Sequence, residues 1–139
     1  MKQHLLKNTY AAIVALFIAM MALPTTAQAQ TKYDLNICGT QVTSDNCGDL
    51  SVIDGVEGTV KYDPDSKTLT LEGAKLNTES NCIKSEIDGL TIKVGGTNDL
   101  NAGYAAAIKV NAPTTITGGG TLNAESKDTA IYARETNLT

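Results

Sequence analysis

Residues 89–110 read GLTIKVGGTNDLNAGYAAAIKV, and this stretch decides the fold that we expect for the chain. It contains three short runs in which apolar and polar side chains alternate, separated by small residues and glycines. Alternation with a period of two is typical of a β-strand. Glycine and asparagine suit the tight turns between strands, because both tolerate positive φ angles. The stretch therefore predicts three short strands joined by tight turns.

The same pattern occurs before and after this stretch. A Leu-Asn pair begins at Leu76, Leu100 and Leu122, at spacings of 24 and 22 residues. An isoleucine preceded by a small residue follows each pair, at Cys82-Ile83, Ala107-Ile108 and Ala130-Ile131. Such a unit buries its apolar side chains only by stacking on its neighbours. We therefore predict an all-β fold, a right-handed parallel β-helix with three strands per coil. A leucine-rich repeat would need a helical segment, and no 3.6-residue period follows Leu35.

The N-terminal third of the sequence differs from the repeats. Residues 58–71 contain two alternating runs around a proline-containing turn, which predicts a β-hairpin. We expect residues 30–67 to form an N-terminal β cap, because an open strand edge invites aggregation. Residues 68–139 would then form the coils. Residues 136–139 repeat the start of a strand, so we expect a fragment truncated at the C-terminus of a longer protein.

Residues 1–29 have the three regions of a secretory signal peptide. Lys2 and Lys7 form a basic start, and an apolar run of 13 residues occupies positions 11–23. Ala27-Gln28-Ala29 then places small residues at the cleavage positions. The apolar run is too short for a helix that crosses about 30 Å of hydrocarbon. We therefore expect a helical leader that is removed, a mature chain without a transmembrane segment, and export to the periplasm, cell surface or extracellular space.

The charge of the mature chain argues against two classes of partner. Without the two leader lysines, residues 30–139 carry nine basic and fifteen acidic side chains, a formal charge of −6. A nucleic-acid-binding domain would show a basic stripe, and an anionic membrane surface attracts basic segments. We therefore predict neither a nucleic acid nor an anionic membrane surface as the partner.

Three cysteines, Cys38, Cys47 and Cys82, lie in the mature chain, where export would place them in an oxidising compartment. Cys38 and Cys47 flank a predicted turn at residues 43–46, so they are the candidate pair for a disulfide across a hairpin. Cys82 would then remain as a small apolar side chain. The only histidine lies in the leader, which excludes a Cys₂His₂ zinc site in the mature chain.

Two stretches of the predicted cap resemble a known group of proteins. Residues 33–46, YDLNICGTQVTSDN, and residues 60–71, VKYDPDSKTLTL, resemble the start of secreted repeat proteins that are common in gut Bacteroidetes. Those proteins continue into coils like residues 89–92 and 115–122 of this chain. They are similar in turn to a carbohydrate-binding β-helix family with a pectate-lyase-like fold. The resemblance therefore implies an exported β-helix that binds carbohydrate.

This chain departs from the family pattern at one place. A large aromatic residue usually stands near position 36 or 38, where this chain has Asn36 and Cys38. If that aromatic side chain packs the cap or contacts sugar in the family, this chain lacks the contact.

The residues that follow the inward isoleucines point outward and are the candidate ligand-binding residues. Lys84, Lys109 and Tyr132 come one position after each isoleucine, and Glu86, Asn111 and Arg134 come two positions later. Two stacked lysines repel each other, so this face would attract an acidic sugar, with Tyr132 as a stacking platform. The alternative is an ordinary solvated strand face on which Glu86 and Arg134 relieve the charge. The candidate binding set is Lys84, Lys109, Tyr132 and Arg134.

The repeats also predict two columns of uncharged polar side chains. Thr70, Thr91, Thr115 and Thr139 would form a hydroxyl ladder. Such a ladder suits a polysaccharide, but threonine also simply suits an exposed strand. A stack at a turn, where asparagine tolerates the left-handed conformation, is expected for Asn77, Asn101 and Asn123. We expect these asparagines to be structural.

Aspartates in the predicted cap are the candidate ligands of a metal ion, namely Asp45, Asp49, Asp54, Asp63 and Asp65. Ca²⁺ takes several oxygen ligands of this kind. No loop of the sequence has the spaced carboxylates of a defined calcium-binding loop, and turn chemistry alone accounts for Asp63 and Asp65. Ca²⁺ is therefore the one candidate cofactor, and the sequence requires none.

The leading hypothesis is a non-catalytic module that binds a polysaccharide, and an acidic one if the lysine face is the site. The first alternative is a structural or adhesive surface protein, whose coils hold something out from the cell. The second is a polysaccharide lyase, which needs a general base near the sugar C5 proton and a group that neutralises the acid, often Ca²⁺. Arg134 is the only arginine, and no carboxylate cluster is visible beside it. We therefore predict that the given chain is not an enzyme.

Overall fold

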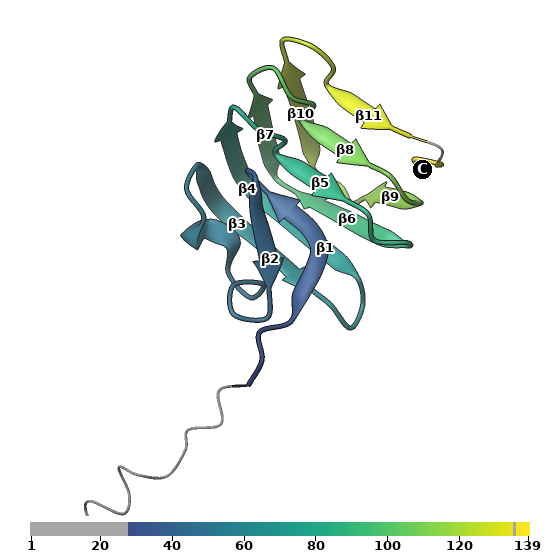
Figure 1. The fold of residues 1–139 in the computed structure, drawn as a ribbon. Coiled ribbons are helices and arrows are strands. Elements are labelled where there is room, and N and C mark those ends of the chain that lie inside the picture. The colour runs from purple at the N-terminus through teal and green to yellow at the C-terminus, as the bar shows by residue number, and fades with distance from the viewer. Residues whose placement is uncertain (1–27, 135) are drawn as a thin grey trace, which may run out of the picture.

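The structure, a computed structural model, describes residues 28–134 and 136–139. Within them the chain is mostly β, with eleven strands and one short 3-10 helix. Figure 1 shows a curled sheet with the N-terminal strands at one end and the last strands at the other. The leader predicted for residues 1–29 lies outside the described residues except for Gln28 and Ala29, so its helix and its cleavage stay predictions.

The repeats form parallel β-ladders. Their strands are β4 (Thr68–Thr78), β5 (Ile83–Ser85), β6 (Leu90–Gly95), β7 (Thr97–Ala102), β8 (Ile108–Val110), β9 (Thr114–Thr117), β10 (Thr121–Ser126) and β11 (Ile131–Ala133). The first half of the long strand β4 pairs with β6, which pairs with β9. The second half of β4 pairs with β7, which pairs with β10, and β5, β8 and β11 form a third ladder. All these pairings are parallel, so the predicted β class and the parallel strands are confirmed.

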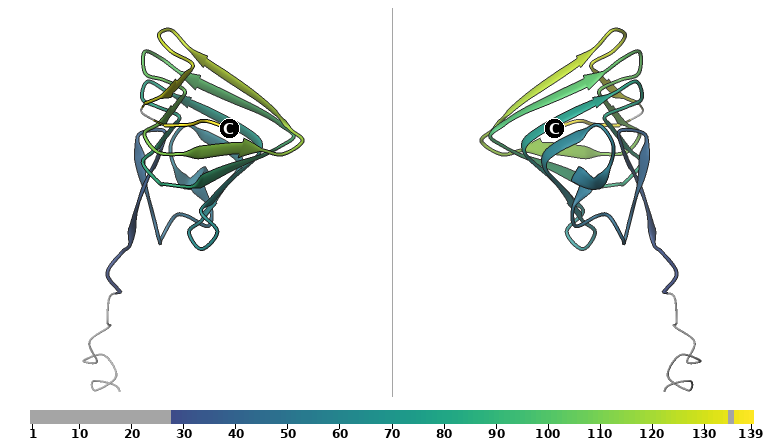
Figure 2. Two further views of the ribbon diagram at one scale, coloured as in Figure 1. Left: turned by 90° about the vertical axis from the view of Figure 1, so that its right-hand side faces the viewer. Right: turned by 90° about the vertical axis from the view of Figure 1, so that its left-hand side faces the viewer.

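Stacked aliphatic side chains fill the interior. Three pairs of register partners, with each residue at most 1% exposed, form its centre: Leu69–Ile92, Leu76–Leu100 and Ile83–Ile108. Full burial of one such side chain contributes about 1.5–3 kcal/mol. Figure 2 shows the strands wrapped around this interior. At the last strand the interior opens, because Ile131, the partner of Ile108, is 41% exposed.

The register of the ladders differs from the repeat that the sequence predicts. Leu76 pairs with Leu100, but Leu100 pairs with Ala124 and not with Leu122. Leu122 is displaced by two residues and pairs with Asn98. A strand alternates every two residues, so a displacement by two keeps the same side chains inward. The alternation in the sequence therefore carries no sign of this displacement.

The predicted stack of asparagines at a turn is wrong. All three residues lie within strands β4, β7 and β10. Asn77 and Asn101 are register partners, whereas Asn123 pairs with Asp99 because of the displacement by two. The turn prediction failed because Leu-Asn lies in a strand whose outward positions simply accept asparagine.

The predicted threonine ladder is wrong at one member. Thr91 pairs with Thr115 on one side, as predicted, but with Thr68 on the other. Thr70 lies two residues further along and pairs with Lys93. The cause is again the two-residue ambiguity of an alternating strand.

The N-terminal segment covers one edge of the parallel ladders. It contains β1 (Lys32–Ile37), β2 (Thr40–Thr43), the 3-10 helix η1 (Leu50–Val52) and β3 (Val56–Asp63). Strand β1 pairs antiparallel with β5, and β3 pairs antiparallel with β4 in the predicted hairpin around residues 63–66. These strands occupy backbone groups that β4 and β5 would otherwise leave at an open edge. The division of the chain at residues 67 and 68 stays a prediction.

Gly58 permits the close approach of β3 to β4. The register of this pair shifts between Glu57 and Thr59, which marks a β-bulge. Gly58 has a φ of +82°, and a Cβ atom there would overlap the carbonyl oxygen of Gly73. Glycine satisfies both demands, so it fits this point of the hairpin.

Asn98 is a fully buried polar side chain near the start of β7. Its Oδ1 accepts a hydrogen bond from the backbone N–H of Ala74 at 2.9 Å. Its Nδ2 donates to the carbonyl oxygens of Gly95 at 3.0 Å and Thr121 at 3.2 Å. These three partners belong to three successive repeats, so one amide joins the repeats where the first ladder turns into the second.

We predict that Asn98→Ala lowers the free energy of unfolding by about 3 kcal/mol, because buried backbone groups lose their partner. Asn101→Ala, on the outward side of the same strand, should change it by less than about 0.5 kcal/mol. Urea unfolding followed by circular dichroism measures both variants. Wild-type stability of Asn98→Ala would show that the amide does not hold this corner.

Candidate functional site

A column of outward side chains crosses the sheet formed by β1, β5, β8 and β11. Lys84 pairs with Lys109, and Lys109 pairs with Tyr132, in the register that the sequence predicts. Asn36 of β1 is the partner of Lys84 on the other side, which the repeat pattern could not reveal. We call Asn36, Lys84, Lys109 and Tyr132 the outer column. Neighbouring strands lie about 4.8 Å apart, so the column spans about 14 Å.

Glu86 lies at ion-pair distance from Lys84, which is what the alternative of an ordinary solvated face expects of it. The Nζ atom of Lys84 lies 4.0 Å from Oε1 of Glu86. The same oxygen accepts a hydrogen bond from Nδ2 of Asn111 at 3.4 Å. The two ion-pair side chains are 42% and 56% exposed, so solvent screening leaves this pair with little net energy.

Lys109 has a contact of another kind, with an aromatic ring. Its Nζ atom lies 5.6 Å from the centre of the Tyr132 ring. An ammonium group at this distance is attracted to the ring face by about 0.5–1 kcal/mol where both are exposed. Tyr132 is 41% exposed. The pair therefore presents an aromatic surface and a positive charge together.

A second pair of this kind, missed in the sequence, lies on the loops that follow β7 and β10. The Nζ atom of Lys127 is 4.6 Å from the centre of the Tyr104 ring, and Tyr104 is 72% exposed. The sequence holds both residues, but they are 23 positions apart. Only the stacking of the two loops brings them together.

A hollow of about 310 Å³ opens beside Lys109 and Tyr132. Its lining residues are Asn81, Ala105, Ala106, Lys109, Asp128, Thr129 and Tyr132. Ala105 follows Tyr104 directly, and Asp128 follows Lys127, so the loops of the second aromatic pair also form this hollow. Aromatic, ammonium, carboxylate, amide and hydroxyl groups around a shallow hollow can stack on a sugar ring and bond its hydroxyls.

A smaller hollow, of about 160 Å³, lies at the other end of the outer column. It is lined by Asp34, Asn36, Gln41, Lys84 and Glu86. The outer column therefore runs between two hollows of different character. The hollow at Lys84 has no aromatic residue in its lining, and the hollow at Tyr132 has one.

Arg134 lies just past the end of β11. Its backbone N–H donates to the carbonyl of Val110 at 3.1 Å, which continues the ladder with β8 by one hydrogen bond. The side chain is exposed, and it lines neither of the two hollows. The structure therefore places Arg134 at the rim of this face, outside the outer column.

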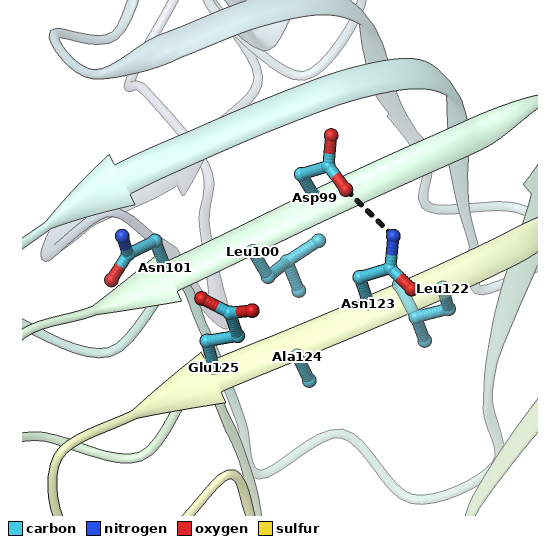
Figure 3. A pocket seen from close by; sticks show the side chains of 7 residues that line it. All are labelled: Asp99, Leu100, Asn101, Leu122, Asn123, Ala124 and Glu125. Carbon is cyan, nitrogen blue, oxygen red and sulfur yellow. Dashed lines mark hydrogen bonds between the residues drawn. The ribbon is translucent and has the colours of Figure 1, made fainter.

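Another hollow, of about 460 Å³, lies on a different face, over β7 and β10 (Figure 3). Its lining residues are Asp99, Leu100, Asn101, Leu122, Asn123, Ala124 and Glu125. Nδ2 of Asn123 donates to Oδ1 of Asp99 at 2.8 Å, and Glu125 is the register partner of Asn101. Two carboxylates and no cation line this hollow, so it repels an acidic ligand electrostatically.

Aspartates of the N-terminal segment take part in turns. Asp49 accepts hydrogen bonds from the backbone N–H of Ser51 at 3.0 Å and from its Oγ at 2.6 Å. Asp63 accepts from the N–H of Asp65 at 3.1 Å and from Oγ of Ser66 at 2.8 Å. Among residues 28–134 and 136–139, no three His, Cys, Asp or Glu side chains converge as metal ligands. Asp49 and Asp63, two of the candidate Ca²⁺ ligands, are thus turn-forming groups here.

The three cysteines carry free thiols in this structure. The Sγ atom of Cys38 lies 3.9 Å from the carbonyl oxygen of Gly55, and that of Cys47 lies 3.8 Å from the carbonyl oxygen of Ser44. Cys82 is fully buried, as predicted for a small inward residue. The disulfide predicted between Cys38 and Cys47 stays a prediction.

No protein-family model, no curated protein and no solved structure matches this chain. The resemblance to secreted Bacteroidetes repeat proteins therefore rests on the quoted residues alone. In the described part of the chain, no helix has the length and apolar character that crossing a membrane requires.

We predict that Ser66 and Ser51 each control the pKa of one aspartate. The Ser66 hydroxyl and then the Asp65 N–H lower the pKa of Asp63, and Ser51 lowers the pKa of Asp49. Ser66→Ala should raise the pKa of Asp63 and leave Asp49 unchanged, and Ser51→Ala should do the reverse. Carboxyl NMR titration of both variants measures the two pKa values.

The direction of the pH effect follows from these lowered values. A pKa that is lower in the folded state stabilises the fold above the unfolded pKa of aspartate. This contribution is lost as the pH falls through the folded pKa. An unchanged titration of Asp63 in Ser66→Ala would contradict the assignment.

Proposed function

We propose that this chain is an exported, non-catalytic β-helix module that binds an acidic polysaccharide through the outer column. The coils would be right-handed, with three strands each. The parent group would be the secreted Bacteroidetes repeat proteins, which are similar to a carbohydrate-binding family with a pectate-lyase-like fold.

Three parallel ladders support the β-helix. Each repeat contributes one strand or half-strand to each ladder, in the order β4, β4, β5, then β6, β7, β8, then β9, β10, β11. Corresponding strands pair in parallel over 23 to 25 positions, as in Thr68–Thr91 and Ile83–Ile108. A chain that winds on itself with a fixed step produces such pairings.

The contact between Lys109 and Tyr132 is the observation that carries the binding site. The ring gives a platform for the apolar face of a sugar, and the ammonium group, 5.6 Å from the ring centre, attracts a carboxylate. Lys84 and Asn36 extend the polar surface along the column. The acidic hollow at Asp99 and Glu125 lies on a different face, so it does not oppose the ligand at short range.

The net charge sets a limit on this site. Residues 30–139 carry a formal charge of −6, which repels a long polyanion at low salt. Attraction at the outer column is therefore a short-range effect of a few residues. Short acidic oligosaccharides should bind at this face more readily than the net charge alone would suggest.

A structural or adhesive role is the second candidate, and exposed apolar side chains favour it. Val52 is 70% exposed and Tyr104 is 72% exposed. Exposed large apolar side chains are suited to contact with a further protein surface. In this case the outer column would be an ordinary solvated face.

We predict that Tyr132→Ala weakens binding of an oligogalacturonate about tenfold, because the ring loses its stacking contact. Lys109→Ala should weaken it about fivefold and reduce its dependence on salt, because one charge contact is lost. Lys75→Ala, an exposed lysine of β4 on another face, is the matched control and should bind as the wild type does. Isothermal titration calorimetry at two salt concentrations measures all three.

Three results would contradict this proposal. Retention on no plant or host polysaccharide in a glycan array would remove the binding role and leave the structural one. Release of unsaturated uronate from the oligogalacturonate, seen by its absorbance, would instead indicate a lyase. If Lys75→Ala, Lys109→Ala and Tyr132→Ala bound the oligogalacturonate equally well, the binding site would lie outside the outer column.

We predict that export yields a mature protein beginning at Gln30, because Ala27 and Ala29 occupy the positions that signal peptidase reads. Intact mass of the protein from the periplasmic fraction of a bacterial host measures this. Ala29→Arg should block the cleavage. An uncleaved N-terminus in the cytoplasmic fraction would contradict export.

A further inference from the structure

Cys38 and Cys82 face each other where β1 meets β5. Ile37 and Ile83 are antiparallel register partners, and the two cysteines occupy the next position on each chain. The backbone N–H of Cys38 donates to the carbonyl of Cys82 at 2.9 Å. Directly opposite residues of an antiparallel pair have Cα atoms about 4.5–5.5 Å apart. Disulfides join Cα atoms about 4.4–6.8 Å apart, so this spacing is compatible with a bond between the two sulfur atoms.

The corner at which Cys82 lies recurs in the later repeats with alanine in place of cysteine. The N–H of Ile83 donates to the carbonyl of Ala107, and the N–H of Ile108 donates to that of Ala130. In each case, as at Cys82, the acceptor is the carbonyl of the small residue that precedes the isoleucine. Thiols thus occupy this corner only where the N-terminal segment joins the first parallel strand.

The two thiols have environments that favour their reaction with each other. Cys82 is fully buried, while Cys38 is partly exposed. The neighbouring thiol of Cys82 lowers the pKa of Cys38, and the same contact together with burial raises the pKa of Cys82. Cys38 is therefore the thiol that ionises first and meets a reagent first.

We infer that Cys38 and Cys82 form a disulfide that ties β1 to β5. This pairing replaces the disulfide expected from sequence between Cys38 and Cys47, because the sulfur of Cys38 can form only one disulfide bond. Cys47 then keeps its thiol, which lies against the carbonyl of Ser44.

The reaction requires a disulfide oxidant, such as oxidised glutathione or an exchange catalyst of an oxidising compartment. The thiolate of Cys38 attacks one sulfur of the oxidant, forms a mixed disulfide and releases one thiolate. Cys82 loses its proton to solvent and attacks the Cys38 sulfur, which releases the second thiolate. Two protein thiols are oxidised, and one oxidant disulfide is reduced to two thiols.

The crosslink would fasten the N-terminal segment to the sheet. It closes a loop of 45 residues that contains β2, β3 and β4. Closing a loop of this length reduces the freedom of the unfolded chain. Reduction of the disulfide should therefore lower the melting temperature by about 10 °C.

The test uses the full chain, oxidised with a glutathione redox buffer and then blocked with a maleimide. Digestion with trypsin and Asp-N separates the three cysteines onto the peptides 34–44, 45–48 and 76–84. Mass spectrometry should find peptide 34–44 joined to 76–84, with maleimide on Cys47. Melting temperatures with and without a phosphine reductant give the second readout.

Matched variants separate the crosslink from simple packing. Cys82→Ala places at this corner the residue that the next repeat already has at Ala107, so the variant should fold. Its melting temperature should no longer fall when the reductant is added. Cys47→Ala should keep both the crosslinked peptide and that effect. Three alkylated cysteines in the oxidised wild type, or a link between Cys38 and Cys47, would overturn the inference. An equal effect of the reductant in Cys82→Ala would overturn it as well.

Discussion

Parallel in-register pairing between successive repeats is the constraint on which the rest of this structure depends. Each strand donates and accepts backbone hydrogen bonds along the stack, so corresponding residues of neighbouring repeats lie about 4.8 Å apart. Each inward side chain then packs against the corresponding inward side chain of the next repeat, as Leu69 packs against Ile92. Inward residues must therefore be aliphatic or small. Outward positions are aligned by the same bonds, whether or not their contacts stabilise the fold.

The corners and the first edge are the places where this constraint needs special residues. Asn98 satisfies backbone groups of three repeats at one corner. Another corner is occupied by the small, fully buried side chains of Cys82 and Ala107. At the first edge, β1 and β3 reverse direction and occupy the free backbone groups of β5 and β4. Cys38 and Cys82 are neighbours at this boundary between antiparallel and parallel strands.

The same alignment gives the two outward faces different neighbouring side chains. On the β5–β8–β11 face the register sets lysine beside lysine and then beside tyrosine. On the β7–β10 face it sets Asp99 against Asn123 and Asn101 against Glu125. Register, and not any single loop, therefore decides which side chains lie side by side on each face.

The sequence by itself determined the β class, the hairpin around residues 63–66 and the alignment of Lys84, Lys109 and Tyr132, because alternation and the isoleucine positions survive in a single chain. Only the tertiary structure decided the register of Leu122 and Thr70, the burial of Asn98 and the neighbour of Cys38. Turns of slightly different length change the spacing between corresponding residues, from 23 at Thr68–Thr91 to 25 at Ile83–Ile108. A displacement by two leaves the alternation intact, so the backbone pairing alone could settle which side chains meet.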